Sequence, residues 1–152
     1  MKRRDAIYLT PEERDAFLRQ TKTIVLSTID QRGYPHSVAM WYVLDDACCL
    51  MTTYAKSQKA MNIRRNPKVA LLAESGSTYD TLKGVLIRGR AELIDDVDVC
   101  VSVLTRVHGK MSGSIPEGIE DALRAQARKR VVIKVIPERV SSWDHSKLGG
   151  MY

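Results

Sequence analysis

The segment TTYAKSQK, residues 52–59, combines residue types that suit the binding of an anion. A predicted strand ends with the hydroxyl groups of Thr52 and Thr53, and Ser57 can cap a helix that follows. The free N–H groups and the positive end of a helix attract anions, and Lys56 and Lys59 add two cationic groups. The segment therefore predicts a site for a terminal phosphate group. An exposed turn with solvated lysines is the alternative that the spacing leaves open.

A second candidate segment, YPHSVAMWY, precedes it in the chain. Alternation along a strand places Val38 and Met40 on one face and Ala39 and Trp41 on the other. A flat heterocycle could lie along this strand, hydrogen-bonded to the backbone and resting against Met40 or Trp41. In the alternative interpretation these side chains only fill the interior of a barrel.

The C-terminal segment SSWDHSKLGG is unusually rich in side chains that contact ligands. It could close over a ligand, with Trp143 stacking on it and Lys147 meeting an anion. A terminal segment held in place by packing is the alternative.

Other catalytic signatures are missing from the sequence. The three histidines and three cysteines lack metal-ligand spacing, so no metal site is expected. There is no GxSxG, GxGxxG or P-loop motif, and no catalytic triad is evident. No catalytic side chain is assigned, because an enzyme of this kind can rely on a cofactor for its chemistry.

Composition limits the class of protein. The 152 residues are 44% hydrophobic and 28% charged, which is typical of one globular domain spanning residues 1–152. The formal charge of +6 favours anionic partners, but the basic residues are scattered without a DNA-reading motif, so we expect no nucleic-acid partner. The sequence has no apolar run long enough to span a membrane and no signal-peptide pattern, which predicts a cytoplasmic protein.

Patterning predicts a mainly β fold with peripheral helices (α+β), built as an antiparallel barrel. Gly89 is expected at a bulge or a close backbone approach. The expected strands cover residues 23–29, 36–44, 47–53, 68–74, 84–93, 131–136 and 140–143. The expected helices cover residues 10–21, 58–66, 95–107 and 116–127, with a loop at 108–114, a turn at 137–139 and an irregular tail from residue 144.

The order of these segments resembles the pyridoxamine 5'-phosphate oxidase-like family of split β-barrels, and within it the flavin- and deazaflavin-dependent oxidoreductases. The stretches that carry the resemblance are LSTIDQRGYPHSVAMWY, LMTTYAKSQKAMNIRRNPKVALL, VLIRGRAELIDD and VVIKVIPERVSSWDHSKLGG. The resemblance implies an FMN-binding-like split barrel and a homodimer with its cofactor at the subunit interface.

The resemblance also implies roles for individual residues. Those bordering the tricyclic ring would be Val38, Ala39, Met40 and Trp41. Those holding the ribityl and phosphate portion would be Thr52, Thr53, Ser57 and Lys59, with Lys56 as a neighbour. Trp143 would approach the cofactor from the tail, of its own or the partner subunit.

The likeness is to the family more than to the pyridoxamine phosphate oxidases proper. Those enzymes carry arginines where Val38 and Gln58 stand, and a C-terminal Arg-Leu-His segment that this chain lacks. The stretch KAMNI after Gln58 looks closer to the branch that uses the deazaflavin coenzyme F-420. We therefore expect hydride transfer between F-420 or FMN and a small conjugated organic substrate. A non-catalytic flavin or haem carrier of the same fold is the alternative.

Overall fold

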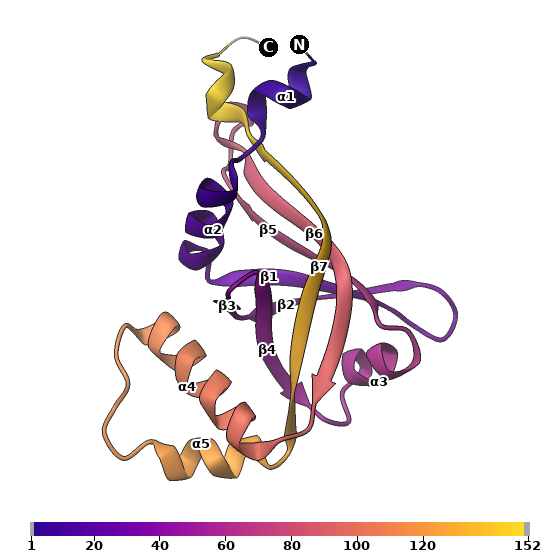
Figure 1. Cartoon of the computed structure of the whole chain (residues 1–152), viewed down its shortest axis with the longest axis vertical. Coiled ribbons are helices and arrows are strands. Elements are labelled where there is room, and N and C mark those ends of the chain that lie inside the picture. Colours follow the sequence, from indigo (N-terminus) through magenta and orange to yellow (C-terminus); the bar gives the residue numbers. More distant parts are fainter. Residues whose placement is uncertain (1, 151–152) are drawn as a thin grey trace.

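The computed structural model describes residues 2–150, which form one curled antiparallel sheet with helices around it (Figure 1). The strands are β1 Thr23–Ile29, β2 Pro35–Trp41, β3 Val43–Asp45, β4 Cys48–Tyr54, β5 Lys68–Ser75, β6 Lys83–Ile94 and β7 Arg130–Asp144. The helices are α1 Arg3–Ile7, α2 Pro11–Gln20, α3 Gln58–Arg65, α4 Val97–Ser112 and α5 Glu120–Ala127, with short 3-10 helices η1 Tyr79–Thr81 and η2 His145–Leu148. The predicted split β-barrel class is confirmed.

The sheet order, β2-β1-β5-β6-β7-β4-β3, makes β2 and β3 its two edges. The sequence predicted one strand over residues 36–44, but Tyr42 divides it between these edges. Tyr42 is fully buried, and its hydroxyl donates a 2.7 Å hydrogen bond to the Leu18 carbonyl at the end of α2. One residue therefore connects the two edges of the sheet.

Strands β6 and β7 are long and bend at a bulge. The sequence predicted a turn at residues 137–139, whereas β7 runs unbroken from Arg130 to Asp144. Pro137 lacks an N–H group, and a strand tolerates it here because the register shifts beside it, between Arg88 and Gly89 on β6. The bulge expected at Gly89 is confirmed, since a Cβ atom there would lie only 2.1 Å from the Ile136 carbonyl oxygen.

Three helical predictions need correction. The loop predicted at residues 108–114 is mostly helix, because α4 continues to Ser112 and ends at Gly113 with a positive φ of 79°. Helix α5 starts at Glu120 rather than at residue 116, and the tail predicted as irregular contains η2. The N-terminal α1 was not predicted. Among residues 2–150, no helix is long and apolar enough to cross a membrane.

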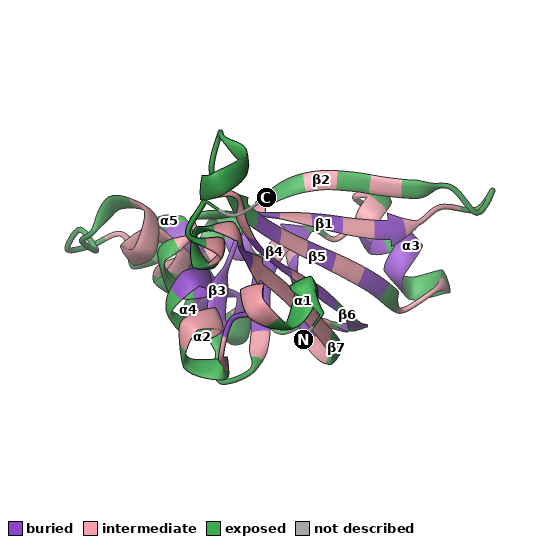
Figure 2. Cartoon of the chain, turned by 90° about the horizontal axis from the view of Figure 1, so that it is seen from above, coloured by how far each residue is buried: buried purple, intermediate pink, exposed green. Residues whose placement is uncertain are grey.

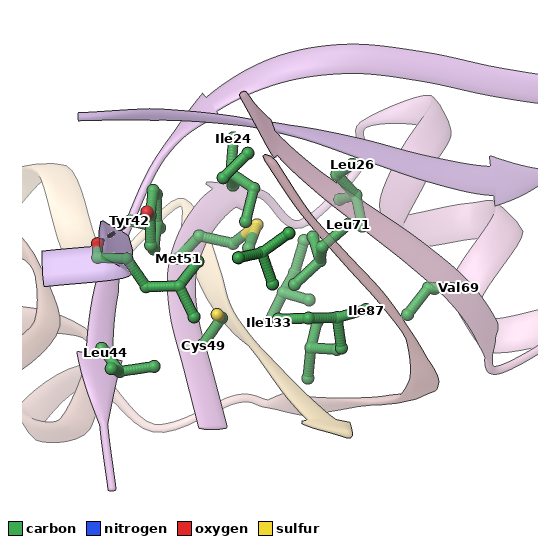
Figure 3. Packing of buried hydrophobic residues seen from close by; sticks show 14 of the residues in the cluster. Ile24, Leu26, Tyr42, Leu44, Cys49, Met51, Val69, Leu71, Ile87 and Ile133 are labelled. Atoms are coloured by element: carbon green, nitrogen blue, oxygen red, sulfur yellow. Dashed lines mark hydrogen bonds between the residues drawn. The ribbon is translucent and has the colours of Figure 1, made fainter. Parts of the chain in front are cut away.

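Two apolar clusters lie on opposite faces of the β3–β4–β7 part of the sheet. The larger fills the barrel with side chains that include Ile24, Met51 and Ile133 (Figure 3). The smaller joins Leu50 and Val132 to helices α4 and α5. Alternation along β4 and β7 therefore sends every second side chain away from the barrel and toward these helices.

Candidate functional site

Four of the predicted site residues share one pocket of about 370 Å³: Ala39, Met40, Trp41 and Thr52. The first three lie at the end of edge strand β2, and Thr52 lies on β4. Trp41 keeps 59% of its surface exposed, so it does not fill the barrel, whereas Met40 packs partly against the barrel core. The opposite wall consists of helix residues: Leu104, Val107, His108 and Met111 from α4, and Leu123 and Gln126 from α5.

Arg130, the first residue of β7, completes this pocket and was missed in the sequence. It stands opposite Tyr54 in the β4–β7 ladder, which brings it to the end of β4. The outward alternation places Thr52, Tyr54 and Arg130 on the same face. In the sequence Arg130 had the place of a cation closing the preceding helix. The signal that could have revealed Arg130 is its position directly before the apolar run Val-Val-Ile, which is typical of a buried strand.

The guanidinium of Arg130 is only partly satisfied. It lies over the Tyr54 ring, with its carbon 4.4 Å from the ring centroid, and one terminal nitrogen is 3.5 Å from the Thr52 hydroxyl. Its Nε is buried without a hydrogen-bond partner in the described chain. A buried donor without an acceptor is costly, so this group suits an anionic ligand.

Lys59 adds a second cation beside Arg130. Partial burial and the positive charge of Arg130 lower the pKa of Lys59 from its usual 10.5. Among residues 2–150, no carboxylate lies within ion-pair distance of Lys59 or Arg130. Two neighbouring cations without a counter-ion form an electropositive site next to the pocket.

Hydrogen bonds of two hydroxyl groups stabilise the loop between β4 and α3. The Ser57 Oγ caps α3 by accepting a 3.2 Å bond from the Ala60 N–H, and it also accepts a 3.0 Å bond from the Thr53 hydroxyl. Thr53 is only 3% exposed, so its hydroxyl supports Ser57. Lys56 is exposed at the turn.

Helix α3 is fixed to the sheet through Asn62, which is fully buried. The Asn62 side-chain amide donates a 3.0 Å bond to the Thr28 hydroxyl on β1, and its oxygen accepts a 2.8 Å bond from Gln58. A buried, satisfied amide of this kind gives α3 one position relative to β1. The N-terminal end of α3, with Ser57 and Lys59, is therefore held in place.

Six predicted residues do not line this pocket: Thr53, Lys56, Ser57 and Lys59 belong to the end of β4 and the start of α3, and Val38 and Trp143 lie elsewhere. Val38 is half-buried on β2 and shares the face of Met40. Trp143 lines another pocket, of about 610 Å³, near η2 and α1. In Figure 1 these elements lie at the opposite end of the barrel from α4 and α5. Within one chain, Trp143 and Arg130 therefore belong to different pockets.

The match to a family model decides the relationship. Residues 10–144 match the model described as pyridoxamine 5'-phosphate oxidase. The chain belongs to this family. Nothing among the curated proteins matches the chain. Among residues 2–150, no group of histidine, cysteine and carboxylate side chains is arranged to hold a metal ion.

Solved structures with a similar fold extend the comparison. A conserved hypothetical protein of Mycobacterium tuberculosis, Rv2991, is 37% identical with a TM-score of 0.93, over 100% of this chain and 95% of that one. An F-420 reductase is 26% identical with a TM-score of 0.70, over 87% of this chain and 98% of that one. The haem storage protein HutZ of Vibrio cholerae shares the fold, at 19% identity and a TM-score of 0.68, over 90% and 97% of the two chains.

Proposed function

We propose that this protein is an oxidoreductase that binds F-420 or FMN and transfers hydride to a small conjugated organic substrate. The observation that carries the proposal is the pair of cations without a carboxylate, of which Arg130 lines a largely apolar pocket and Lys59 lies beside Arg130. A phosphorylated, planar coenzyme has the matching chemistry, since one end is anionic and the other is a flat ring. The F-420 reductase among the similar structures supports this choice.

The anionic end would lie near the start of α3. Lys59 and Arg130 would supply the charges, and Lys56 would contribute at longer range. The Ser57 hydroxyl accepts two hydrogen bonds and keeps its own proton to donate. Thr53 would act through Ser57, because its hydroxyl already donates to that side chain. The Nε–H group of the Arg130 guanidinium would gain the acceptor that it lacks.

The ring would lie beside the end of β2. Ala39, Met40 and Trp41 border the pocket there, Thr52 adds a hydroxyl, and Val38 precedes them on the strand. The bound coenzyme supplies hydride. The chain's residues bind and orient the reactants and exclude water, which is the usual division of work in a cofactor enzyme.

Trp143 can belong to the proposed site only if it comes from a second subunit. Trp143 is held in the pocket near α1, where a Cβ atom on Gly84 would come within 2.3 Å of its ring. A residue fixed at that end can contact a ligand beside α3 only from another copy of the chain. We therefore propose a homodimer with the coenzyme between the subunits.

Equilibrium titration of the apo-protein with FMN and with F-420, followed by fluorescence, tests the proposal. We expect tight binding of one coenzyme. The Arg130→Gln and Lys59→Gln variants each lose charge-assisted hydrogen bonds, for which we expect an affinity loss of about ten- to a hundred-fold.

The matched controls are Arg128→Gln and Lys68→Gln, two exposed cations away from the pocket. Both controls should bind like the wild type. Wild-type affinity in both Arg130→Gln and Lys59→Gln would overturn the anion site. Tight binding with no turnover across a panel of conjugated carbonyl compounds would point instead to a flavin carrier.

A further inference from the structure

We propose that His108 is the proton donor that completes reduction of the substrate in the pocket. This inference rests on the proposed function and goes beyond it, because hydride transfer alone assigns no catalytic side chain. Reduction of a polarised double bond needs a proton as well as a hydride, and a positioned side chain commonly supplies it.

The position of His108 supports this role. It lies on the part of α4 that the sequence did not predict as helix, and it lines the same pocket as Ala39, Met40 and Trp41 of β2. Its side chain is half-buried, and no described residue hydrogen-bonds either ring nitrogen. The Ser112 hydroxyl donates a 2.8 Å hydrogen bond to the backbone carbonyl of His108 and does not contact the ring nitrogens. Both ring nitrogens are therefore available to a ligand.

The other lining residues are poor donors by comparison. Those with exchangeable side-chain protons are Trp41, Thr52, His108, Gln126 and Arg130. The indole, hydroxyl and amide groups are too weakly acidic to give up a proton near neutral pH, and a guanidinium stays charged in proteins. Histidine is the side-chain type whose ordinary pKa, ~6.5, lies close to neutrality. His108 is the single lining residue of that type.

The charges around the pocket are also consistent with a donor. Arg130 on β7 is the one charged side chain besides His108 among the lining residues, and the β2, β4 and α5 residues that face them are uncharged. The nearby cations of α4 point elsewhere, since Arg106 donates to the Leu44 carbonyl and Lys110 to the Leu18 carbonyl. No carboxylate lines the pocket, so a proton on His108 is not committed to an ion pair.

The proposed step balances as follows for a conjugated carbonyl compound. The β-carbon of the substrate receives hydride and forms a C–H bond, while the reduced coenzyme is oxidised by two electrons. The electron pair of the opened double bond moves toward the carbonyl group and leaves an enolate. The imidazolium of His108 gives its N–H proton to the α-carbon of the enolate. Neutral His108 then takes a proton from solvent.

The test uses the full chain loaded with the coenzyme that it binds, and compares His108→Gln with the wild type. Ser102→Gln is the matched control, because it places the same side chain on the exposed face of α4. With cyclohex-2-en-1-one as substrate probe, we expect His108→Gln to lower kcat/KM about a hundred-fold. The decline of the wild-type rate as the pH rises above neutrality should disappear in this variant.

A second readout does not depend on turnover. The anion 4-nitrophenolate imitates the enolate, and its binding can be followed by absorbance. A protonated imidazole should favour this anion, so wild-type affinity for the phenolate form should fall as the pH rises. His108→Gln should bind it weakly at every pH. In His108→Ala, added imidazole should restore part of the rate, which a purely structural role would not allow.

The outcomes separate the two proposals. If the wild type binds neither FMN nor F-420, the proposed function fails and this inference falls with it. If coenzyme binding is normal while His108→Gln keeps the wild-type rate, pH profile or phenolate affinity, only the assignment of His108 is overturned. Loss of rate equally in Ser102→Gln would also overturn it, because the effect would then belong to the helix.

Discussion

The two ends of the barrel differ in whether particular cations are paired with carboxylates. Near the start of α3, Lys59 and Arg130 lie together without a carboxylate partner in the described chain. Near α1 and η2, the lysines are paired: Lys147 lies 2.6 Å from Glu13, and Lys83 lies 3.6 Å from Asp144. The chain therefore pairs Lys147 and Lys83 with carboxylates near α1 and η2, whereas Lys59 and Arg130 near the start of α3 have no such partner.

This difference indicates which charges serve the architecture. The paired lysines connect the C-terminal segment to α2 and β6, and Lys147 also donates a 2.9 Å bond to the Tyr8 carbonyl. Burial, followed by the positive charge of Arg130, lowers the pKa of Lys59, so these unpaired cations contribute no such connection. Groups that cost stability where they lie are candidates for ligand binding.

The largest expected effect on folding lies at the paired end. Asp144 is 9% exposed and accepts bonds from the Ser146 N–H and hydroxyl, in addition to its pairing with Lys83. Asp144→Asn should lower the free energy of unfolding by about 1–3 kcal/mol, because the charge-assisted bonds weaken. Urea denaturation measures it. Arg130→Gln in the apo-protein should show no loss, and a loss as large as that of Asp144→Asn would remove the distinction between the two ends.

The next effect is a pH dependence at the unpaired end. Burial, followed by the charge of Arg130, lowers the pKa of Lys59 below 10.5, so this lysine loses its proton at a lower pH than an ordinary one. Only the protonated form attracts an anion. Coenzyme affinity should therefore fall, by roughly ten-fold, as the pH rises through that lowered pKa. Titrations at a series of alkaline pH values in wild type and Lys59→Arg measure it, and the arginine variant should keep its affinity.

The smallest effect concerns the exposed Glu13–Lys147 pair. The bond from Lys147, then the bond from the Thr10 N–H, lowers the pKa of Glu13 from its usual 4.5. A carboxyl whose pKa is lower in the folded state adds stability above its unfolded pKa, and this is lost as the pH falls through the folded pKa. Glu13→Gln should therefore lower the melting temperature by at most a few degrees at pH 7, and the difference from wild type should shrink steadily as the pH falls toward 3. A difference that did not shrink by pH 3 would assign the effect to packing.

Most of the sheet could be predicted from the sequence because local patterns determine it. Strand β1 was predicted with its exact bounds, and β5 differed by one residue. Strand β7 was divided in the prediction because a proline normally ends a strand. The bulge beside Gly89 that accommodates Pro137 arises from pairing with β6, which lies far away in the sequence.

The candidate site shows the same difference between features set by local sequence and features set by tertiary contacts. Ala39, Met40, Trp41 and Thr52 were predicted from their local segments and from the family resemblance, and they do share a pocket. Arg130 and His108 were not found, because their positions depend on the pairing of β4 with β7 and on the packing of α4 against the sheet. The separation of Trp143 from that pocket is likewise a property of the tertiary structure.

The single residue between β2 and β3 has a mechanical consequence. The two sheet edges carry no ladder between them, yet the peptide bonds of Tyr42 hold them together at one point. That point is itself anchored to α2 by the buried phenol. Any separation of the two edges must therefore increase with distance from Tyr42, which makes the Trp41 end of β2 the part of that edge held nearest to β3. Thermal motion should then displace the proposed ring site least at this end of the pocket.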